Sequence, residues 1–297
     1  MVRNLRKRSN MERLIIFFAT ICLFVCAPIF GQEEEQKEEI DTTLYYIANN
    51  YETLAKPPFK PGELLEFKAS IGWVKAAEAT FGVSDIIYTT NNKPTYKIDI
   101  NAKTVGIFDL VSSVRDNWGT YVDTTNYETQ QFYRYIKEGR FRKNEIVYFD
   151  HEADSAHVAK LHKETRVLER TEDFRISENV QDMVSSFYYL RAVDWSQFDI
   201  GDIITINVFF DDKLEPQRVK IVDREIVKTK LGKVKSVVLI PIREKDSLFV
   251  EENTVKVWLS DDLNKIPLKV KAKIYVGYLT VDIKDAKNIR HPLALVD

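Results

Sequence analysis

Apolar and polar side chains alternate one by one along much of this chain, and this period of two constrains its fold more than any other feature. Leu65, Phe67 and Ala69, for example, alternate with Glu66 and Lys68. Because successive side chains of a strand point to opposite faces, such a run predicts a half-buried strand with one face on a core and the other toward water. Runs of this kind lie at residues 65–73, 77–84, 96–103 and 268–276.

Further short strands are expected along the chain, with turn residues between them. They cover residues 114–122, 130–138, 141–149, 155–161, 203–210, 216–227, 233–241 and 254–260. Many short strands without a strand–helix–strand rhythm favour an antiparallel sheet, a sandwich or a barrel. A further run covers residues 279–284, where Leu279, Val281 and Ile283 are apolar and their neighbours polar. Its parity differs from that of 268–276, and the change falls at Gly277, which predicts a bulge or a tight bend at that position.

One segment in the middle of the chain departs from the period of two. Asn179 is a candidate N-cap with Asp182 at the third helical position, and apolar residues then recur at helical spacing through Val193. A single amphipathic helix over residues 180–193 can cover an open sheet or fill a barrel. We therefore expect a mainly β protein. Its core would be a strongly curved antiparallel sheet, or incomplete β-barrel, with one central amphipathic helix packed on the concave side.

The first 31 residues have the pattern of a secretory signal peptide. A basic leader precedes an apolar run from Leu14 to Ala27, and an acidic run begins at Gln32. The apolar run is short for a membrane span, at roughly 14 residues against about 20 needed. We expect export to the periplasm, with outer-membrane association left open and no transmembrane segment after cleavage. The expected organisation is a signal peptide at 1–31, an acidic and mostly disordered lead-in at 32–56 and a single β-rich domain at 57–297.

Removal of the leader makes the chain acidic and free of cysteine. The leader holds five of the 43 Lys and Arg residues, one of the 45 Asp and Glu residues and both cysteines. The acidic remainder argues against nucleic acid as a partner and has no general attraction to an anionic membrane. Disulfides and thiolate chemistry are excluded with the cysteines. Lipidation at Cys26 is disfavoured, because bulky Val25 stands where a lipoprotein signal has a small residue.

Three of the four histidines lie close together in the sequence, at His151, His157 and His162. With nearby carboxylates they resemble a set of zinc ligands, but their spacing fits no compact zinc motif. We expect exposed imidazoles around a turn between two strands. The sequence therefore predicts no metal site and no cofactor.

Adjacent carboxylates occur twice, and each pair follows an apolar strand. Acid–base chemistry by paired carboxylates is one interpretation, but turn residues are the expected one. A nucleophile motif of the Gly-x-Ser-x-Gly type and a Gly-rich phosphate loop are both absent from the sequence. We expect no catalytic residue. The two pairs are Asp211-Asp212 and Asp261-Asp262.

Aromatic residues crowd the central strands and the predicted helix, and arginines lie among them. Aromatic side chains suit the core of a sheet, and they equally suit the lining of a groove for a ligand. In the second interpretation the aromatic residues contact an apolar chain and an arginine faces an anionic head group. The candidate ligand-binding residues are Tyr133, Tyr135, Phe187, Tyr188, Arg115 and Arg134.

Six stretches, taken in order, carry a family resemblance. They read FKPGE from residue 59, IGWVKAAEA from 71, VRD from 114, RYIKEG from 134, DMVSSFYYLR from 182 and VWLSDDLNKIPL from 257. Together they resemble an uncharacterised bacterial family of exported proteins, the domain of unknown function 3108. The resemblance implies export in a Gram-negative cell and a β-rich fold, and it transfers no catalytic residue because the family has no assigned activity. By looser analogy the architecture is similar to periplasmic lipoprotein carriers, which hold acyl chains inside an incomplete barrel.

Three hypotheses for function follow. The first is an exported, non-enzymatic binding protein for an apolar or amphipathic ligand, such as a lipid or a lipoprotein acyl chain. The second is an envelope scaffold or assembly factor that binds another protein. The third is a hydrolase that uses Asp261, Asp262 or the histidines.

Overall fold

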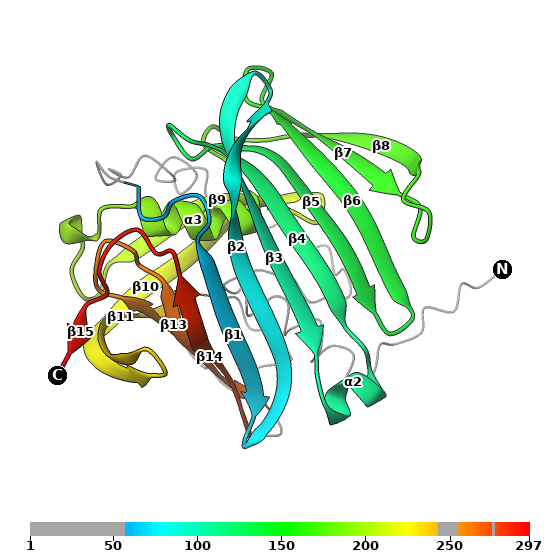
Figure 1. Ribbon diagram of the computed structural model, residues 1–297. Coiled ribbons are helices and arrows are strands. Elements are labelled where there is room, and N and C mark those ends of the chain that lie inside the picture. The colour runs from blue at the N-terminus through cyan, green and yellow to red at the C-terminus, as the bar shows by residue number, and fades with distance from the viewer. Residues whose placement is uncertain (1–56, 243–254, 275–276) are drawn as a thin grey trace, which may run out of the picture.

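The computed structural model describes residues 57–242, 255–274 and 277–297. A strongly curved antiparallel sheet wraps around one short helix, as the sequence predicts (Figure 1). The predicted signal peptide at residues 1–31 and the lead-in at 32–56 lie outside the described residues. The protein is mainly β.

Fifteen strands form the sheet, and most pair with their neighbours in the sequence. In chain order they are β1 (Leu64–Ile71), β2 (Val74–Thr90), β3 (Lys93–Thr104), β4 (Arg115–Asp123), β5 (Thr129–Glu138), β6 (Phe141–Asp150), β7 (Ser155–Leu161), β8 (Leu168–Arg175), β9 (Ile203–Phe210), β10 (Lys213–Thr229), β11 (Gly232–Ile242), β12 (Val255–Ser260), β13 (Pro267–Ile274), β14 (Gly277–Lys287) and β15 (Leu295–Val296). Across the sheet their order is β8-β7-β6-β5-β4-β3-β2-β1-β14-β13-β12-β11-β10-β9, and β15 pairs with β11. Each strand range predicted from the sequence corresponds to one of these strands.

Strand β8 is the one long strand that the sequence analysis missed. Its residues read LERTEDFR and are exposed at most positions, so they carry no apolar alternation. β8 is an end strand of the sheet, and charged residues on an edge strand discourage pairing with other chains. The same charged residues leave β8 without the apolar alternation from which the other strands were predicted.

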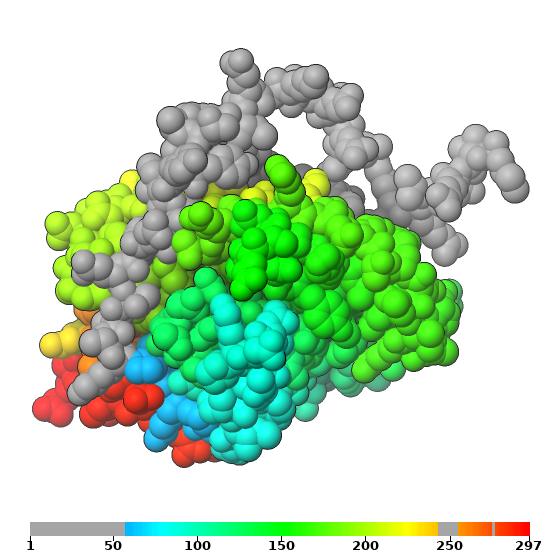
Figure 2. All heavy atoms as spheres, turned by 90° about the horizontal axis from the view of Figure 1, so that it is seen from above, coloured from blue at the N-terminus to red at the C-terminus, as the bar shows by residue number. Residues whose placement is uncertain are grey.

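The two ends of the described chain meet in the middle of the sheet. β1 pairs with β2 on one side and with β14 on the other, both antiparallel. Seen from above, the blue start of the described chain lies beside the red C-terminal segment (Figure 2). This junction joins the β1–β8 half of the sheet to the β9–β14 half, so the domain depends on contacts between segments far apart in sequence.

The sheet ends at β8 and β9, and contacts other than a strand pair join these two edges. The rings of Phe174 on β8 and Phe209 on β9 lie 5.6 Å apart between centroids. Between the edges, the Gln181 backbone N–H donates to the Asn207 carbonyl (2.9 Å), and the Gln181 carbonyl accepts from the Phe209 N–H (2.8 Å). The barrel is therefore incomplete, because ring contacts and one bridging residue replace the last row of strand hydrogen bonds.

Helix α3 (Met183–Ala192) packs inside the curved sheet, and it begins later than the sequence predicts. Its N-cap is Asp182, whose carboxylate accepts the N–H groups of Val184 (2.7 Å) and Ser185 (2.9 Å). The Ser185 hydroxyl in turn accepts the Asp182 N–H at 2.8 Å, which completes a capping box. The prediction of Asn179 as the N-cap was wrong. That residue has a positive φ of 54° in the segment before the helix.

Helix α3 is buried on nearly its whole circumference. Ser186 alone among its residues is not fully buried. The sequence predicted an amphipathic helix with one polar face, whereas the side turned away from the sheet is also covered. Arg191 shows why, since its guanidinium donates to the carbonyl of Asn264 (2.9 Å) and to Glu63, both outside the helix. The described residues also form two shorter helical segments, α2 (Ile107–Val111) and η2 (Trp195–Gln197).

Gly277 lies at a hairpin between two strands. β13 and β14 pair antiparallel, with Ile274 opposite Gly277. The predicted change of parity therefore marks a tight bend, and the φ of 115° at Gly277 explains why glycine occupies it.

Candidate functional site

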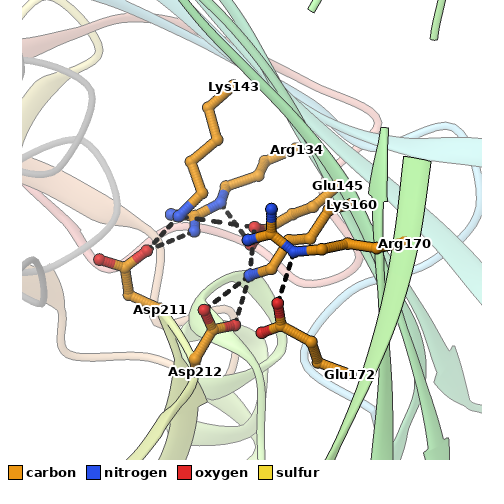
Figure 3. A network of polar contacts seen from close by, with 8 residues as sticks. All are labelled: Arg134, Lys143, Glu145, Lys160, Arg170, Glu172, Asp211 and Asp212. Carbon is orange, nitrogen blue, oxygen red and sulfur yellow. Dashed lines mark hydrogen bonds and ion pairs between the residues drawn. The ribbon is translucent and has the colours of Figure 1, made fainter. Parts of the chain in front are cut away.

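Charged side chains gather inside the barrel, where the β9–β10 turn meets the concave faces of β5 to β8 (Figure 3). Strand parity places them there, because Arg134 shares the inward side of β5 with Phe132, and Lys160 that of β7 with Val158. We name this group the ionic cluster. It consists of Arg134, Lys143, Glu145, Lys160, Arg170, Glu172, Asp211 and Asp212.

The β9–β10 turn supplies two carboxylates to the ionic cluster. Phe210 pairs with Lys213, so Asp211 and Asp212 form a two-residue hairpin loop. Both have positive φ, 54° and 68°, as the type I′ turn requires, and aspartate tolerates this conformation better than most residues. The expectation that this carboxylate pair forms a turn is confirmed, and the turn directs both side chains at β5 to β7.

The inner half of the ionic cluster is almost inaccessible to solvent. Arg134 and Glu145 are 4% and 2% exposed, and Arg134 Nε lies 2.5 Å from Glu145 Oε1. Arg134 Nη2 also donates to Asp211 Oδ1 at 2.6 Å, and Lys143 contacts the same oxygen. Burial opposes ionisation of Asp211, but Arg134 and Lys143 outweigh it and lower the pKa of this carboxyl to about 2. Burial likewise opposes ionisation of Glu145, but Arg134, Lys143 and Lys160 outweigh it and lower the pKa of this carboxyl, so both carboxylates of the inner half are charged at neutral pH.

Aromatic rings complete the surroundings of Arg134. Its guanidinium carbon lies 4.5 Å from the centroid of Phe210 and 5.8 Å from that of Trp118. The two rings stack on each other with centroids 5.6 Å apart. A planar guanidinium between carboxylates and ring faces is held in one orientation. Arg134 therefore joins the turn between β9 and β10 to the opposite wall of the barrel.

The outer half of the ionic cluster borders a pocket of about 350 Å³, which we name the basic pocket. Lys160 Nζ donates to both oxygens of Asp212, at 2.5 and 2.7 Å, on its inner wall. Five Lys or Arg side chains and one histidine line it, against two carboxylates. The lining residues are Arg142, Lys143, Asn144, Lys160, Leu161, His162, Lys163, Glu169, Arg170 and Asp212.

The basic pocket has the chemistry of an anion site. Arg142 and Lys163 face it, and neither forms an ion pair with a carboxylate among the described residues. The carboxylate of Asp212 already binds among these cations, where it forms an ion pair with Lys160. Arginine and lysine donors around a cavity of this size suit a phosphate or carboxylate group.

The structure does not bring the predicted ligand-binding residues together. Tyr133 and Tyr135 lie on the outer face of β5, opposite to Arg134, because adjacent strand residues point to opposite sides. The Tyr133 hydroxyl donates to the carboxylate of Asp99. The guanidinium carbon of Arg166 lies 4.1 Å from the centroid of the Tyr135 ring. These contacts give both tyrosines a structural role on the outside of the sheet.

Arg115 also lies away from the barrel interior. It forms a two-point ion pair with Asp109 of α2, with bonds of 2.7 and 3.0 Å. The guanidinium is thus committed to holding α2 against the start of β4. Arg134 alone among the six predicted residues belongs to the ionic cluster.

Phe187 and Tyr188 lie inside the barrel but pack against the protein's own aromatic rings. Phe59 contacts Tyr188 with centroids 4.9 Å apart, and Phe81 contacts Phe187 at 5.7 Å. Both helix residues are almost fully buried. Their contact with an apolar ligand stays a prediction, and in the described state they fill the core around α3.

The histidines of the predicted cluster are dispersed. His151 contacts the carbonyl of Thr129 (2.7 Å) at one end of the barrel, and His157 pairs with Asp173 on the outside of β7. His162 lies in the turn after β7, at the opposite end of that strand from His151. No group of three potential metal ligands occurs among residues 57–242, 255–274 and 277–297.

The second carboxylate pair has structural partners. Asp262 Oδ1 accepts the N–H of Asn264 at 2.8 Å, and Asp261 pairs with Arg224 at 2.8 Å. The turn predicted after β12 is therefore confirmed. These bonds fix the loop that covers α3.

Most of the ionic cluster escaped the sequence analysis, although a signal was present. Arg134, Glu145 and Lys160 occupy inward positions of strands whose other inward residues are apolar. A charged residue at a core position in three consecutive strands indicates a buried polar site. The partners of these residues in the β9–β10 turn lie more than fifty positions away, so their identity was not visible from local pattern.

Within the described part of the chain, the helices are all too short or too polar to cross a bilayer.

Comparison with known proteins identifies a family. The family model described as "Protein of unknown function (DUF3108)" matches residues 66–284. No match was found among curated proteins.

A solved structure that superposes with a TM-score above 0.5 supports the β-barrel-like fold. A β-barrel-like protein of the domain of unknown function DUF1849 from Brucella abortus superposes with a TM-score of 0.51 at 8% identity, over 78% of this chain and 100% of that one. A hypothetical protein from Chlamydia trachomatis reaches 0.34 at 7% identity, over 80% and 93% of the two chains. A candidate exported protein with a YmcC-like fold from Bacteroides fragilis reaches 0.26 at 8% identity, over 77% and 98%.

Proposed function

The chain belongs to the DUF3108 family of proteins of unknown function, and we propose that it is an exported, non-enzymatic binding protein for an amphipathic ligand with an anionic head, such as a lipid. The expected signal peptide supports export to the periplasm. The basic pocket supports an anionic ligand.

The observation that carries this proposal is the excess of positive charge around the basic pocket. Five Lys or Arg side chains line it against two carboxylates, in a chain whose total charge is −2. Arg142 and Lys163 offer donors that no carboxylate of the described residues occupies. An anionic head group would bind between them and Lys160, where the low exposure of Lys160 strengthens the attraction.

Apolar side chains beside the basic pocket support an amphipathic ligand over a free anion. Leu161 lines the pocket itself. Val167, in the turn before β8, and Leu168, the first residue of β8, are more than half exposed. Apolar ligand surface laid over them would contribute roughly 25 cal/mol per Å² removed from water, before the costs of association.

Two measurements test this function. Native mass spectrometry of the protein purified from the periplasm, followed by lipid extraction, should reveal a co-purifying mass of lipid size. Calorimetry with dihexanoyl phosphatidylglycerol, a soluble lipid with an anionic head, should show binding to the delipidated protein. A clean apo mass together with no calorimetric signal would contradict the proposal.

A matched pair of variants locates the site. Lys163→Glu should weaken phosphatidylglycerol binding by about tenfold or more, because a charge-assisted hydrogen bond contributes roughly 1.5–3 kcal/mol. Arg175→Glu makes the same charge change at the other end of β8 and should leave binding unaltered. Equal effects of the two variants would show that net charge, and not the basic pocket, determines affinity.

The scaffold hypothesis has less support. Strand addition to a partner needs an open edge, and the edge strand β8 carries charged residues at five of its eight positions, which discourages pairing. The hydrolase hypothesis loses its candidates as well, because Asp261 and Asp262 fix a turn and the histidines are dispersed.

A further inference from the structure

We propose that one end of the barrel docks on an anionic lipid surface. This end, which we name the basic rim, consists of residues 71–76, 103–115, 137–143 and 161–170. They are α2 and the turns at one end of strands β1 to β8, along the lower and right-hand edge of Figure 1. The inference goes beyond the proposed ligand and does not require it.

The segments of the basic rim form a connected surface. The N–H of Val105 donates to the Ala76 carbonyl (2.9 Å), which joins the segment before α2 to the start of β2. The N–H of Gly139 donates to the Ser113 carbonyl (2.8 Å), which joins the segment after α2 to the β5–β6 turn. The β7–β8 turn adjoins β6 across the basic pocket. The four segments therefore adjoin one another along one end of the barrel.

Charge is strongly segregated to the basic rim. Its four segments contain ten Lys or Arg and four Asp or Glu residues, although the whole chain has 43 and 45. The turns at the opposite end of the same strands, residues 84–95, 123–130 and 149–156, contain one Lys and six Asp or Glu residues. A negative lipid surface would attract the basic rim, repel the opposite end and so orient the barrel.

Large apolar side chains project from the basic rim. Trp73, at the tip of the β1–β2 hairpin, is 94% exposed, and Leu110 of α2 is 88% exposed. Ile107, Val111 and Val167 are each more than half exposed. Tryptophan and leucine on protruding tips, with cations around them, are suited to insertion between lipid head groups.

These features favour lipid over a protein partner. The apolar side chains come from separate tips and are interspersed with lysines and arginines, so they do not form the continuous apolar centre of a stable protein interface. Arg140 is exposed and forms no ion pair with any described residue, so it is available to phosphate groups. Positive charge around apolar tips is complementary to an anionic bilayer, whose surface is negative and whose interior is apolar.

Trp73 provides a direct spectroscopic test. The other three tryptophans, Trp118, Trp195 and Trp258, are each less than 10% exposed, so a change in solvent exposure is expected at Trp73 alone. Vesicles of phosphatidylglycerol and phosphatidylcholine should shift the emission to shorter wavelength, and brominated lipids should quench it. Phosphatidylcholine vesicles should give a much smaller change, and added salt should reverse the shift.

Variants assign the contact to individual residues. Leu110→Ser and Arg140→Glu should each lower partitioning onto the anionic vesicles by roughly tenfold, measured by co-sedimentation. The matched controls are Ile86→Ser and Arg175→Glu, since both residues are exposed at the other end of their strands. Trp73→Phe should abolish the spectral change and retain most of the partitioning. Circular dichroism on every variant checks that the fold is intact.

Several results would overturn the proposal. Equal partitioning onto anionic and zwitterionic vesicles would exclude docking by the basic rim. An emission wavelength of Trp73 that does not change when the protein binds vesicles would exclude it as well. Equal loss in the rim variants and their controls would do the same. Self-association of the protein that Leu110→Ser abolishes, without vesicle binding, would assign the apolar tips to a second copy of the chain. Lys163 belongs to both the basic rim and the basic pocket, so the two proposals are separated with the wild-type protein. Calorimetry with monomeric dihexanoyl phosphatidylglycerol tests ligand binding without a lipid surface, so binding of the monomer without vesicle binding contradicts docking alone, and the reverse contradicts ligand binding alone.

Discussion

Arg191 and Glu63 form a two-point ion pair in which both side chains are fully buried. Arg191 Nη1 donates to Glu63 Oε1 at 2.7 Å, and Nη2 donates to Oε2 at 2.9 Å. The pair joins the end of α3 to the residue that precedes β1, across 128 positions of sequence. The central helix is thereby attached to the strand at which the two halves of the sheet meet.

Removal of Arg191 should severely destabilise the protein. Arg191→Met leaves the Glu63 carboxylate buried without its partner, and the loss of a buried partner typically costs about 3–5 kcal/mol. Urea denaturation should show this loss in the free energy of unfolding. Arg224→Met is the control, because it breaks an exposed pair with Asp261 and should cost about 1 kcal/mol or less. A double variant, Glu63→Leu with Arg191→Met, should recover part of the stability, since no charge is left buried.

Asp116 should make the protein less stable as the pH rises. Burial raises the pKa of this carboxyl to about 7, despite the bond it accepts from the Lys137 N–H. Its pKa in the unfolded chain is close to 3.8, so the folded protein holds the proton more tightly between these two values. The free energy of unfolding should therefore fall between about pH 4 and 7, by roughly 4 kcal/mol in the limit. Denaturant titrations of Asp116→Asn, which retains the acceptor, should show a flatter profile. A profile as steep as that of the wild type would assign the effect to another group.

Asp211 should give the opposite dependence at lower pH. Arg134 and Lys143 overcome the effect of burial and lower its pKa to about 2. A lowered folded-state pKa means that the stabilisation is complete above the unfolded value near 3.8 and is lost as the pH falls toward 2. Asp211→Asn should remove about 2 kcal/mol of stability at pH 7 and very little at pH 2. Thermal unfolding at both pH values measures the difference, and an equal loss at the two would show that the charge is unimportant.

Neutralising Asp212 should strengthen anion binding in the basic pocket. Asp212→Asn keeps a residue that tolerates positive φ in the type I′ turn, but it removes the nearer of the two carboxylate partners of Lys160 and leaves only Glu145, at 3.4 Å. The freed charge should raise the affinity for inorganic phosphate by roughly tenfold, measured by calorimetry. Asp261→Asn, at the other carboxylate turn, is the matched control. Unchanged phosphate affinity in Asp212→Asn would show that Lys160 does not face the bound anion.

The strand pattern was readable from the sequence because it is local. Alternation of Leu65, Phe67 and Ala69 with polar neighbours reports which residues share a face, and the paired aspartates at 211–212 report a turn. The helix was recognisable for the same reason, although its start was misplaced. Asn179 and Asp182 both suit an N-cap, and only the bonds of Asp182 to Ser185 and Thr120 decide between them.

The candidate site was much less predictable. Tyr133, Arg134 and Tyr135 are consecutive, and the sequence analysis grouped them around one ligand. Alternation alone indicates that Arg134 points to the opposite face of the sheet from Tyr133 and Tyr135, but it does not indicate which of the two faces is concave. That choice depends on the curvature of the whole sheet and on the distant turn at Asp211, whose carboxylate meets Arg134 inside the barrel.

The sequence by itself determined the antiparallel strands, their turns, the central helix and the family, because each of these follows from neighbouring residues. Only the tertiary structure decided that the barrel interior divides into an aromatic core around α3 and an ionic cluster beneath the β9–β10 turn. It also decided that ten basic residues from four separate segments share one rim. The physical reason is that charge and burial act through space. Residues such as Lys160 and Asp212, 52 positions apart, acquire their roles only when the sheet curves and brings them into contact.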